Sequence, residues 1–119
     1  PVSLIDVYPS LVDLARLTIP DWLDGTSIKG QLAQPTTPRP PAISSYGEGN
    51  TSIRTPRWRY IRYEDGSEEL YDHRLDPNEW TNLANNPEHE ETKKRLAQMI
   101  PADQHPGLKV QSWFDKFQK

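Results

Sequence analysis

The sequence contains no cysteine among its 119 residues. This absence excludes a disulfide framework, a thiolate metal site and a thiol nucleophile for this chain. Hydrophobic residues are scarce, at 34% of the total, and no apolar run approaches the roughly 20 residues that a membrane-spanning helix needs. Together with twelve prolines, this predicts at most one modest, loop-rich domain. Such a composition is typical of a piece cut from a larger protein, although a small loop-rich domain would have similar numbers.

An excess of charge of one sign is also absent, because 14 basic residues stand against 17 acidic ones for a net charge of -3. We therefore predict neither nucleic acid nor a membrane as a partner. The sequence begins at Pro1, without a Met or a signal-like segment, so we expect the natural amino terminus to lie elsewhere.

The clearest pattern that is present runs from 58 to 72, where two alternating segments flank Asp65-Gly66. Glycine accepts the positive φ that closes a tight loop, and Asp can bond its own backbone nearby. We take Glu64 to Ser67 as a four-residue loop of a β-hairpin. The cross-strand pairs predicted by this register are Tyr63–Glu68, Arg62–Glu69, Ile61–Leu70, Tyr60–Tyr71 and Arg59–Asp72.

A short helical turn is predicted directly after the hairpin. Asp76 has the position of an N-cap, Pro77 that of the first helical residue and Glu79 that of the third. Trp80 and Leu83 are three residues apart, so we expect both to close over the hairpin.

The remaining segments complete an α+β fold, a small antiparallel four-stranded meander with a packed carboxy-terminal helix and a preceding helix. Strands are expected over 42–46 and 51–54, and helices over about 4–16 and 87–99. The first helix should be capped by Ser3 and bent by Pro9. Its apolar stripe is Leu4, Val7, Leu11, Leu14 and Ala15. The second helix should bury Thr92, Leu96, Met99 and Ile100, and the tail holds one more amphipathic candidate, Val110, Trp113, Phe114 and Phe117.

The run DGSEELYDHRLDPNEWTNLA, residues 65–84, resembles the carboxy-terminal signature of the type I, formylglycine-dependent sulfatases. It is most similar to iduronate-2-sulfatase-like and choline-sulfatase-like members. Residues 2–11 are similar to the last helix of the sulfatase catalytic domain, and 23–27 to the LDG-x-S loop that leaves it. The family usually ends this helix with Gly. This chain has Arg16 there, so the left-handed exit would be strained or replaced.

The resemblance implies four segments. These are 1–17, the last helix of the α/β alkaline-phosphatase-like catalytic domain; 18–41, a connector; 42–100, the carboxy-terminal sulfatase subdomain; and 101–119, an extension. It further implies a parent sulfuric ester hydrolase, in a family that is often periplasmic, secreted or lysosomal. Its partners would be the missing N-terminal catalytic domain and a sulfated small molecule or glycan.

Sulfatase catalysis in the family uses calcium and a formylglycine made from Cys or Ser in a Cys/Ser-x-Pro-x-Arg motif. The nearest string in this chain, Thr36-Thr37-Pro38-Arg39, lacks the Ser and the residue between Pro and Arg. We therefore assign no catalytic residue, no metal ligand and no cofactor to this chain, and expect it to be inactive alone. A free-standing binding or interaction module without catalysis is the alternative. The apolar stripe of helix 4–16 favours the sulfatase fragment, because it needs a larger partner layer than this chain supplies.

Substrate contact is expected from the loop and strand between Tyr46 and Arg54, which by resemblance face the catalytic cleft. Asn50 offers a donor and an acceptor, and Arg54 a planar cationic fork suited to sulfate or carboxylate. Thr51 stands where close relatives carry a His, which bears on substrate range. The candidate substrate-binding residues are Tyr46, Asn50, Thr51 and Arg54. The alternative is a plain surface turn with Arg54 paired to a hairpin carboxylate such as Glu68 or Glu69.

Two further groups of residues have structural interpretations. The histidines His73, His89 and His105 are dispersed, so we expect solvated or capping side chains rather than metal ligands. The aromatic residues Trp58, Tyr60, Tyr63, Tyr71 and Trp80 could form a sugar-stacking platform. Their alternating spacing favours the core of a small sheet instead.

Overall fold

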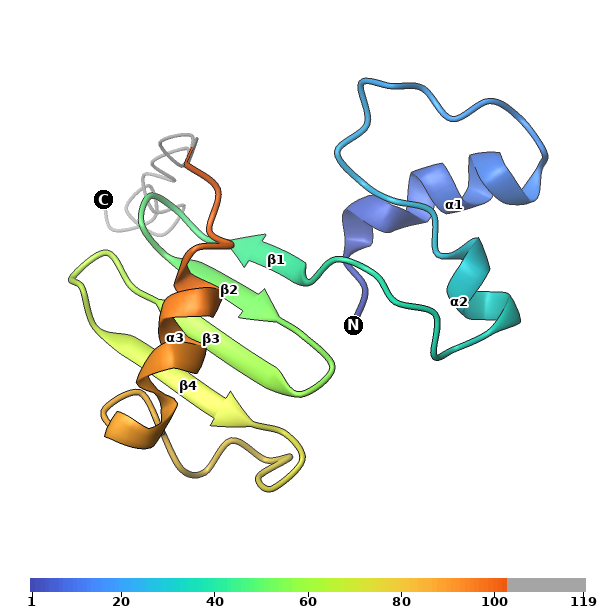
Figure 1. Cartoon of the computed structure of the whole chain (residues 1–119). Coiled ribbons are helices and arrows are strands. Elements are labelled where there is room, and N and C mark those ends of the chain that lie inside the picture. Colours follow the sequence, from blue (N-terminus) through green and yellow to red (C-terminus); the bar gives the residue numbers. More distant parts are fainter. Residues whose placement is uncertain (103–119) are drawn as a thin grey trace, which may run out of the picture. The chain divides into compact units, whose positions relative to one another are not determined.

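The computed structural model describes residues 1–102 of the chain, so the predicted tail helix around Val110 to Phe117 lies outside the described residues. The elements, in order, are η1 (Leu4–Asp6), α1 (Val7–Leu14), α2 (Lys29–Ala33), β1 (Ala42–Ser45), β2 (Thr51–Arg54), β3 (Trp58–Arg62), β4 (Glu68–Asp72), η2 (Pro87–His89) and α3 (Glu90–Ala97) (Figure 1). The predicted α+β class and all four strands are confirmed. Two compact units form, Pro1–Ala42 and a second that starts at Ile43. None of the helices within residues 1–102 is long and apolar enough to span a membrane.

The first unit is organised around the buried carboxylate of Asp6. Its oxygens accept hydrogen bonds from the Ser3 amide (2.7 Å), the Thr26 amide (2.9 Å) and the Arg39 guanidinium (2.7 Å). Burial pushes the pKa of Asp6 upward, but these bonds outweigh burial and lower the pKa below its usual value. One side chain thus caps the first helix and ties it to the loop at Thr26 and to the connector.

Helix α1 ends in a left-handed turn at Arg16, where the sulfatase family usually carries a glycine. The Leu17 amide donates to the Val12 carbonyl and the Arg16 amide to the Asp13 carbonyl, both at 3.0 Å, which is a Schellman arrangement. Arg16 occupies the left-handed position with φ of 60°. The expected strain is therefore present.

The apolar stripe of the first helix is exposed in this chain. Leu4, Val7, Leu11 and Leu14 all face solvent, whereas Pro9 and Ser10 are buried. Ser10 accepts a hydrogen bond from the Ile28 amide (3.0 Å), at the start of the short helix α2. The sequence did not predict α2, because five residues without apolar periodicity look like a part of the connector.

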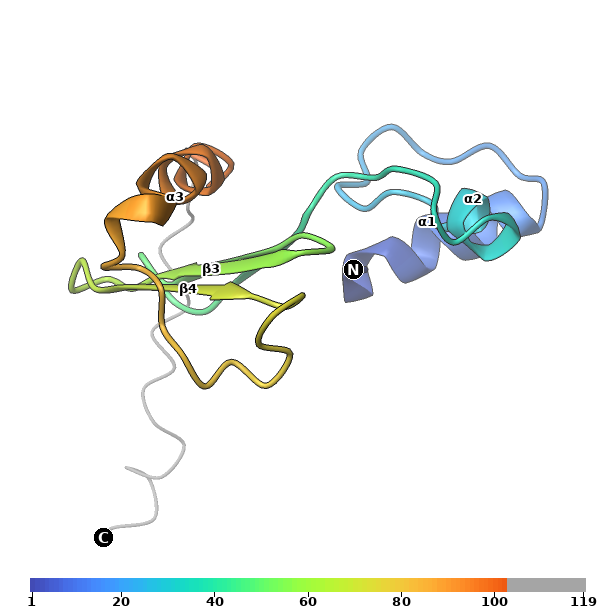
Figure 2. The same cartoon turned by 60° about the horizontal axis from the view of Figure 1, so that its bottom comes forward.

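The second unit is a four-stranded sheet in the order β1-β2-β3-β4, with each strand beside the next in sequence. Helix α3 covers one face of the sheet, and much of the segment that follows β4 lies on the other (Figure 2). The core between the sheet and α3 contains Ile53, Trp58, Tyr60, Leu70, Ala84 and Leu96. Within this unit, the two sheet faces therefore have different environments.

The predicted hairpin register is wrong by one residue. Tyr60 lies opposite Leu70 and Arg62 opposite Glu68. The Tyr63 amide bonds the Ser67 carbonyl and the Gly66 amide bonds the Tyr63 carbonyl, both at 3.0 Å, so the loop has three residues rather than four. Gly66 takes φ of 82°. This is the left-handed residue that follows a type I turn in a three-residue hairpin loop.

The predicted helical turn after β4 does not form. The Thr81 amide reaches back to the Asp76 carboxylate (2.8 Å), and Glu79 adopts a left-handed φ of 59°, which a helix cannot contain. Leu83 packs against the core as predicted. Trp80 does not, because 84% of it is exposed.

Helix α3 starts after a 3-10 turn capped by Asn86, whose side chain accepts from the Glu88 amide (3.0 Å). Leu96 is buried and Ile100 is packed against the core, as predicted. Met99 is 37% exposed, contrary to the prediction. Ala97 packs against the core instead, beside Leu96 and Ile100.

Candidate functional site

The loop between β1 and β2 is closed by two left-handed glycines. Gly47 has φ of 64° and Gly49 φ of 79°, and the Tyr46 amide bonds the Asn50 carbonyl at 3.0 Å. A Cβ on Gly49 would lie 2.9 Å from the Cα of Glu64. Glycine is therefore required here by backbone conformation and by the close approach of the hairpin loop.

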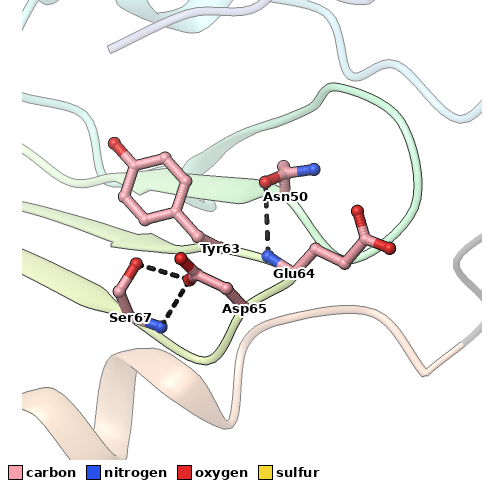
Figure 3. A pocket seen from close by; sticks show the side chains of 5 residues that line it. All are labelled: Asn50, Tyr63, Glu64, Asp65 and Ser67. Carbon is pink, nitrogen blue, oxygen red and sulfur yellow. Dashed lines mark hydrogen bonds between the residues drawn. The ribbon is translucent and has the colours of Figure 1, made fainter.

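Asn50 connects this loop to the hairpin. Its Oδ1 accepts from the Glu64 amide at 3.3 Å, and its Nδ2 donates to the Glu48 carbonyl at 3.1 Å. A cavity of about 720 Å³ lies beside this contact. Figure 3 shows the side chains that line it, Asn50, Tyr63, Glu64, Asp65 and Ser67. The Asp65 side chain is hydrogen-bonded within its own loop, since its Oδ1 accepts from the amide and the hydroxyl of Ser67.

A second cavity, of about 250 Å³, lies over the first three strands. Its lining is rich in hydroxyl groups: Ser44, Ser45, Tyr46, Asn50, Thr51, Ser52, Arg59, Ile61 and Tyr63. Asn50 and Tyr63 line both cavities. The loop predicted to approach a substrate therefore borders two hollows on the surface of this unit.

The four predicted site residues do not share one face of the sheet. Tyr46 is 84% exposed and Asn50 is half-buried, both at the cavities. Thr51 is only 1% exposed and its hydroxyl lies 3.3 Å from that of Ser45. Arg54 is three positions further along β2, so its side chain leaves the opposite face from that of Thr51. The structure brings Tyr46, Asn50 and Thr51 together around the smaller cavity and leaves Arg54 outside its lining.

Arg54 is bonded to groups other than those that the sequence suggested. Its Nη1 donates to the carbonyls of Thr55 and Trp58, and its Nη2 lies 2.8 Å from Nδ1 of His73. The alternative of a pair with Glu68 or Glu69 is wrong, because Arg54 lies opposite Arg59 at one end of β3, whereas Glu68 and Glu69 lie opposite Arg62 and Ile61 toward the other end. Burial, rather than a carboxylate, is the main influence on Arg54 and lowers its pKa.

His73 links Arg54 to a second arginine, so the expectation of a solvated or capping histidine is wrong at this position. A guanidinium can only donate, so Nδ1 of His73 accepts and Nε2 carries the proton. That Nε2 donates to Glu79 at 2.6 Å. Glu79 also accepts from Nη1 of Arg59, at 2.8 and 3.2 Å. The chain Arg54–His73–Glu79–Arg59, here called the arginine network, lies on the face away from α3.

The aromatic residues belong mostly to the sheet, as predicted. Trp58 and Tyr60 are in the core, and the ring of His89 meets Trp58 edge-on at 5.4 Å. On the other face, the hydroxyls of Tyr63 and Tyr71 both donate to Glu69. Burial and this bond raise the pKa of Tyr71 to about 12. These tyrosines stay neutral donors over the whole physiological range.

Metal-ligating side chains do not gather in the part of the chain that the structure describes. No group of three or more His, Asp or Glu residues within 1–102 could hold a metal ion. Within residues 43–102, what the second unit offers is a hydroxyl-rich surface with arginine side chains, which suits a polar, anionic molecule.

Comparison with known proteins finds a matching family and several similar sulfatases. Residues 2–105 match the family described as N-sulphoglucosamine sulphohydrolase, C-terminal. The chain is 34% identical to a sulfatase of Formosa agariphila over 102 residues, with 85% of this chain and 20% of the relative covered. It is 38% identical to arylsulfatase K of Mus musculus, with 70% of this chain and 18% of the relative covered. A choline-sulfatase of Rhizobium meliloti is 33% identical, with 73% and 18% covered.

Solved structures are also similar to this chain. A protein in complex with its substrate D-glucosamine-2-N,6-O-disulfate superposes with a TM-score of 0.68 at 27% identity, with 80% of this chain and 22% of that chain covered. A 2-O GAG sulfatase superposes at 0.67, also with 27% identity, and with 80% and 23% covered. The chain spans about a fifth of the length of the curated relatives it matches. Since the matching family covers most of the sequence, the chain belongs to the family of N-sulphoglucosamine sulphohydrolase carboxy-terminal domains, the carboxy-terminal domain of sulfatases.

Proposed function

We propose that this chain is the carboxy-terminal subdomain of a sulfuric ester hydrolase and that it supplies packing surface and one wall of the substrate cleft. The observation that carries the proposal is the exposed apolar face of η1 and α1, Leu4, Val7, Leu11 and Leu14, in a chain that spans about a fifth of its sulfatase relatives. A solvent-facing stripe of this kind marks an interaction site. The missing partner is the N-terminal catalytic domain.

The proposed cleft wall consists of Asn50, which lines both cavities, and Tyr46, which lines the smaller one. Thr51 and Arg54 support this wall from the two faces of the sheet, through the Ser45 hydroxyl and through His73 respectively. A sulfated carbohydrate is the proposed substrate, in line with the sugar disulfate named for one structural relative. The run 65–84 also supports an iduronate-2-sulfatase-like subtype as part of this proposal.

Calcium and formylglycine would belong to the catalytic domain in this proposal. The residues of this chain do not fit either group, because the sequence has neither a Cys nor a Ser-x-Pro-x-Arg string and residues 1–102 hold no cluster of metal ligands. The role of this chain is therefore to bind and orient rather than to react.

The test is hydrolysis of an aryl sulfate and of sulfated glucosamine by the full-length protein that contains this chain. We expect sulfate release by the full-length protein and none by residues 1–119 alone. An upstream sequence without a Cys/Ser-x-Pro-x-Arg motif, together with a full-length protein that releases no sulfate, would favour the free-standing binding module instead.

A further inference from the structure

Arg59 is the arginine of the network that stays available to a ligand. Its Nη1 is held by Glu79 and its Nε lies 3.4 Å from the Ser52 hydroxyl. Within residues 1–102 no acceptor bonds its Nη2, and the side chain is 39% exposed. Arg54, by contrast, uses both terminal nitrogens on protein acceptors. The sequence had placed Arg59 in a structural pair with Asp72, which the corrected register removes.

The surroundings of Arg59 are those of a sugar-binding surface. Arg59 lines the cavity of about 250 Å³ together with Tyr46, Ser52, Ile61 and Tyr63. This volume is close to the lower end, about 300 Å³, of small-ligand sites, which suits one ring rather than a long chain. Hydroxyl groups, aromatic rings and one guanidinium provide polar contacts, a stacking surface and a partner for an oxyanion.

Glu79 holds this guanidinium at a cost in backbone energy. Its φ of 59° lies in the left-handed region, where a non-glycine residue is strained. The carboxylate so placed accepts from both Arg59 and His73. Because one carboxylate and one neutral imidazole join two arginines, the network keeps a net positive charge beside the cavity.

We propose that Arg59 binds an anionic group, a sulfate or a carboxylate, on a sugar ring seated in this cavity, and that Glu79 is its positioning residue. This inference rests on the proposed function, since the sugar would be a part of the sulfatase substrate. It assigns recognition of a second anionic group, separate from the sulfate that is hydrolysed.

The test compares Arg59→Met with Arg62→Met in the full-length protein. Arg62 is on the same strand, but its side chain leaves the other face and does not line this cavity. Calorimetric titrations would use D-glucosamine-2-N,6-O-disulfate, glucosamine 6-sulfate, a glucuronate-containing disaccharide and unsubstituted glucosamine. We expect Arg59→Met to weaken binding of the disulfate or of the uronate by about tenfold or more. The compound that responds identifies the anionic group. Arg62→Met should bind like the wild type.

The role of Glu79 as the positioning residue of Arg59 is tested by a separate variant. Glu79→Gln should weaken binding of the same anionic compound severalfold while its affinity for unsubstituted glucosamine is unchanged, a discrimination that a general loss of stability would not produce. Arg59-dependent binding by a protein that hydrolyses no sulfate ester would reject the proposed function and keep this inference. Equal affinities of wild type and Arg59→Met, or no binding of any of the four compounds, would overturn the inference.

Discussion

Arg16 shows how one side chain can oppose the geometry of its own position. The Schellman turn at the end of α1 requires a left-handed residue, and Arg16 takes φ of 60° although its Cβ is disfavoured there. Contacts elsewhere in the fold keep Arg16 in the left-handed conformation, which glycine would adopt without strain. A stabilising substitution is therefore available at this site.

We expect Arg16→Gly to raise the free energy of unfolding by about 0.5–1 kcal/mol, since relief of strain exceeds the entropic cost of glycine. Ala15→Gly is the matched control, because Ala15 has φ of -74° and no strain to relieve. It should lower stability by about 0.5–1 kcal/mol. Urea unfolding of the two variants measures both values, and a loss of stability in Arg16→Gly would contradict the strain.

Asp72 is a second residue whose state matters for stability. It is buried and accepts a bidentate pair from Arg57, with Nη2 at 2.6 Å and Nε at 3.0 Å. The hydrogen bond from Arg57 lowers the pKa of Asp72 in the folded protein. The unfolded chain has a pKa of about 3.9, so the stabilisation is fully present above that value and is lost as pH falls through the folded pKa.

Stability should therefore decrease from about pH 5 toward pH 2 with a contribution from Asp72. Thermal melts of wild type and Asp72→Asn over this range measure it. The variant should be less stable at pH 7, because Arg57 loses its charged partner, and its decrease with acid should be shallower. Parallel pH profiles for the two proteins would show that Asp72 does not contribute.

At the scale of elements, α3 is joined to the sheet by apolar packing and by an ion pair. Leu96 is buried in the core, and Lys93 lies 2.9 Å from Glu68 on β4. Glu68 also accepts from the hydroxyl of the buried Tyr60 at 2.5 Å. The apolar contact should dominate the energy, since a partly exposed ion pair contributes little.

Leu96→Ala should cost about 2–4 kcal/mol of stability, because it leaves a cavity under α3. Met99→Ala should cost under about 1 kcal/mol, since Met99 is already partly in solvent. Chemical unfolding of the two variants separates the positions, which sequence periodicity alone treats as equivalent. Similar losses would mean that Met99 belongs to the core.

At the scale of the whole molecule, the apolar stripe of η1 and α1 connects this chain to the rest of a sulfatase. Leu11 is exposed in residues 1–119 and would be covered in the proposed full-length protein. The same substitution should therefore have different effects in the two backgrounds.

Leu11→Asp should leave the melting temperature of the isolated chain nearly unchanged. In the full-length protein it should cost about 2–4 kcal/mol, because a charge is then buried without a partner. Leu11→Met, which keeps an apolar side chain, should be tolerated in both. Small, equal effects of Leu11→Asp in both proteins would mean that the stripe faces solvent.

Local chemistry was sufficient for most of the secondary structure of this chain. The alternation of 58–72, the pair Ser3 and Asp6, and Asn86 before Pro87 each act over a few residues, so their consequences can be predicted without the fold. The strain at Arg16 was predicted instead from the family resemblance, which places a glycine at this helix end. The family resemblance added the connection to sulfatases, which the comparisons confirmed for the carboxy-terminal domain.

The tertiary structure alone decided the register and the partners of the charged side chains. Asp65-Gly66 fits a loop of three or four residues equally well, and the choice depends on which side chains α3 covers. That choice turned Arg59 away from Asp72 and toward Glu79, twenty residues further along the chain. Trp80 stayed exposed because the predicted helical turn does not form at the left-handed Glu79. Met99 stayed exposed because Ala97 and Ile100 pack beside Leu96 instead. The sequence by itself thus determined the four strands and the first and last helices, while contacts distant in sequence determined which side chains face the candidate site.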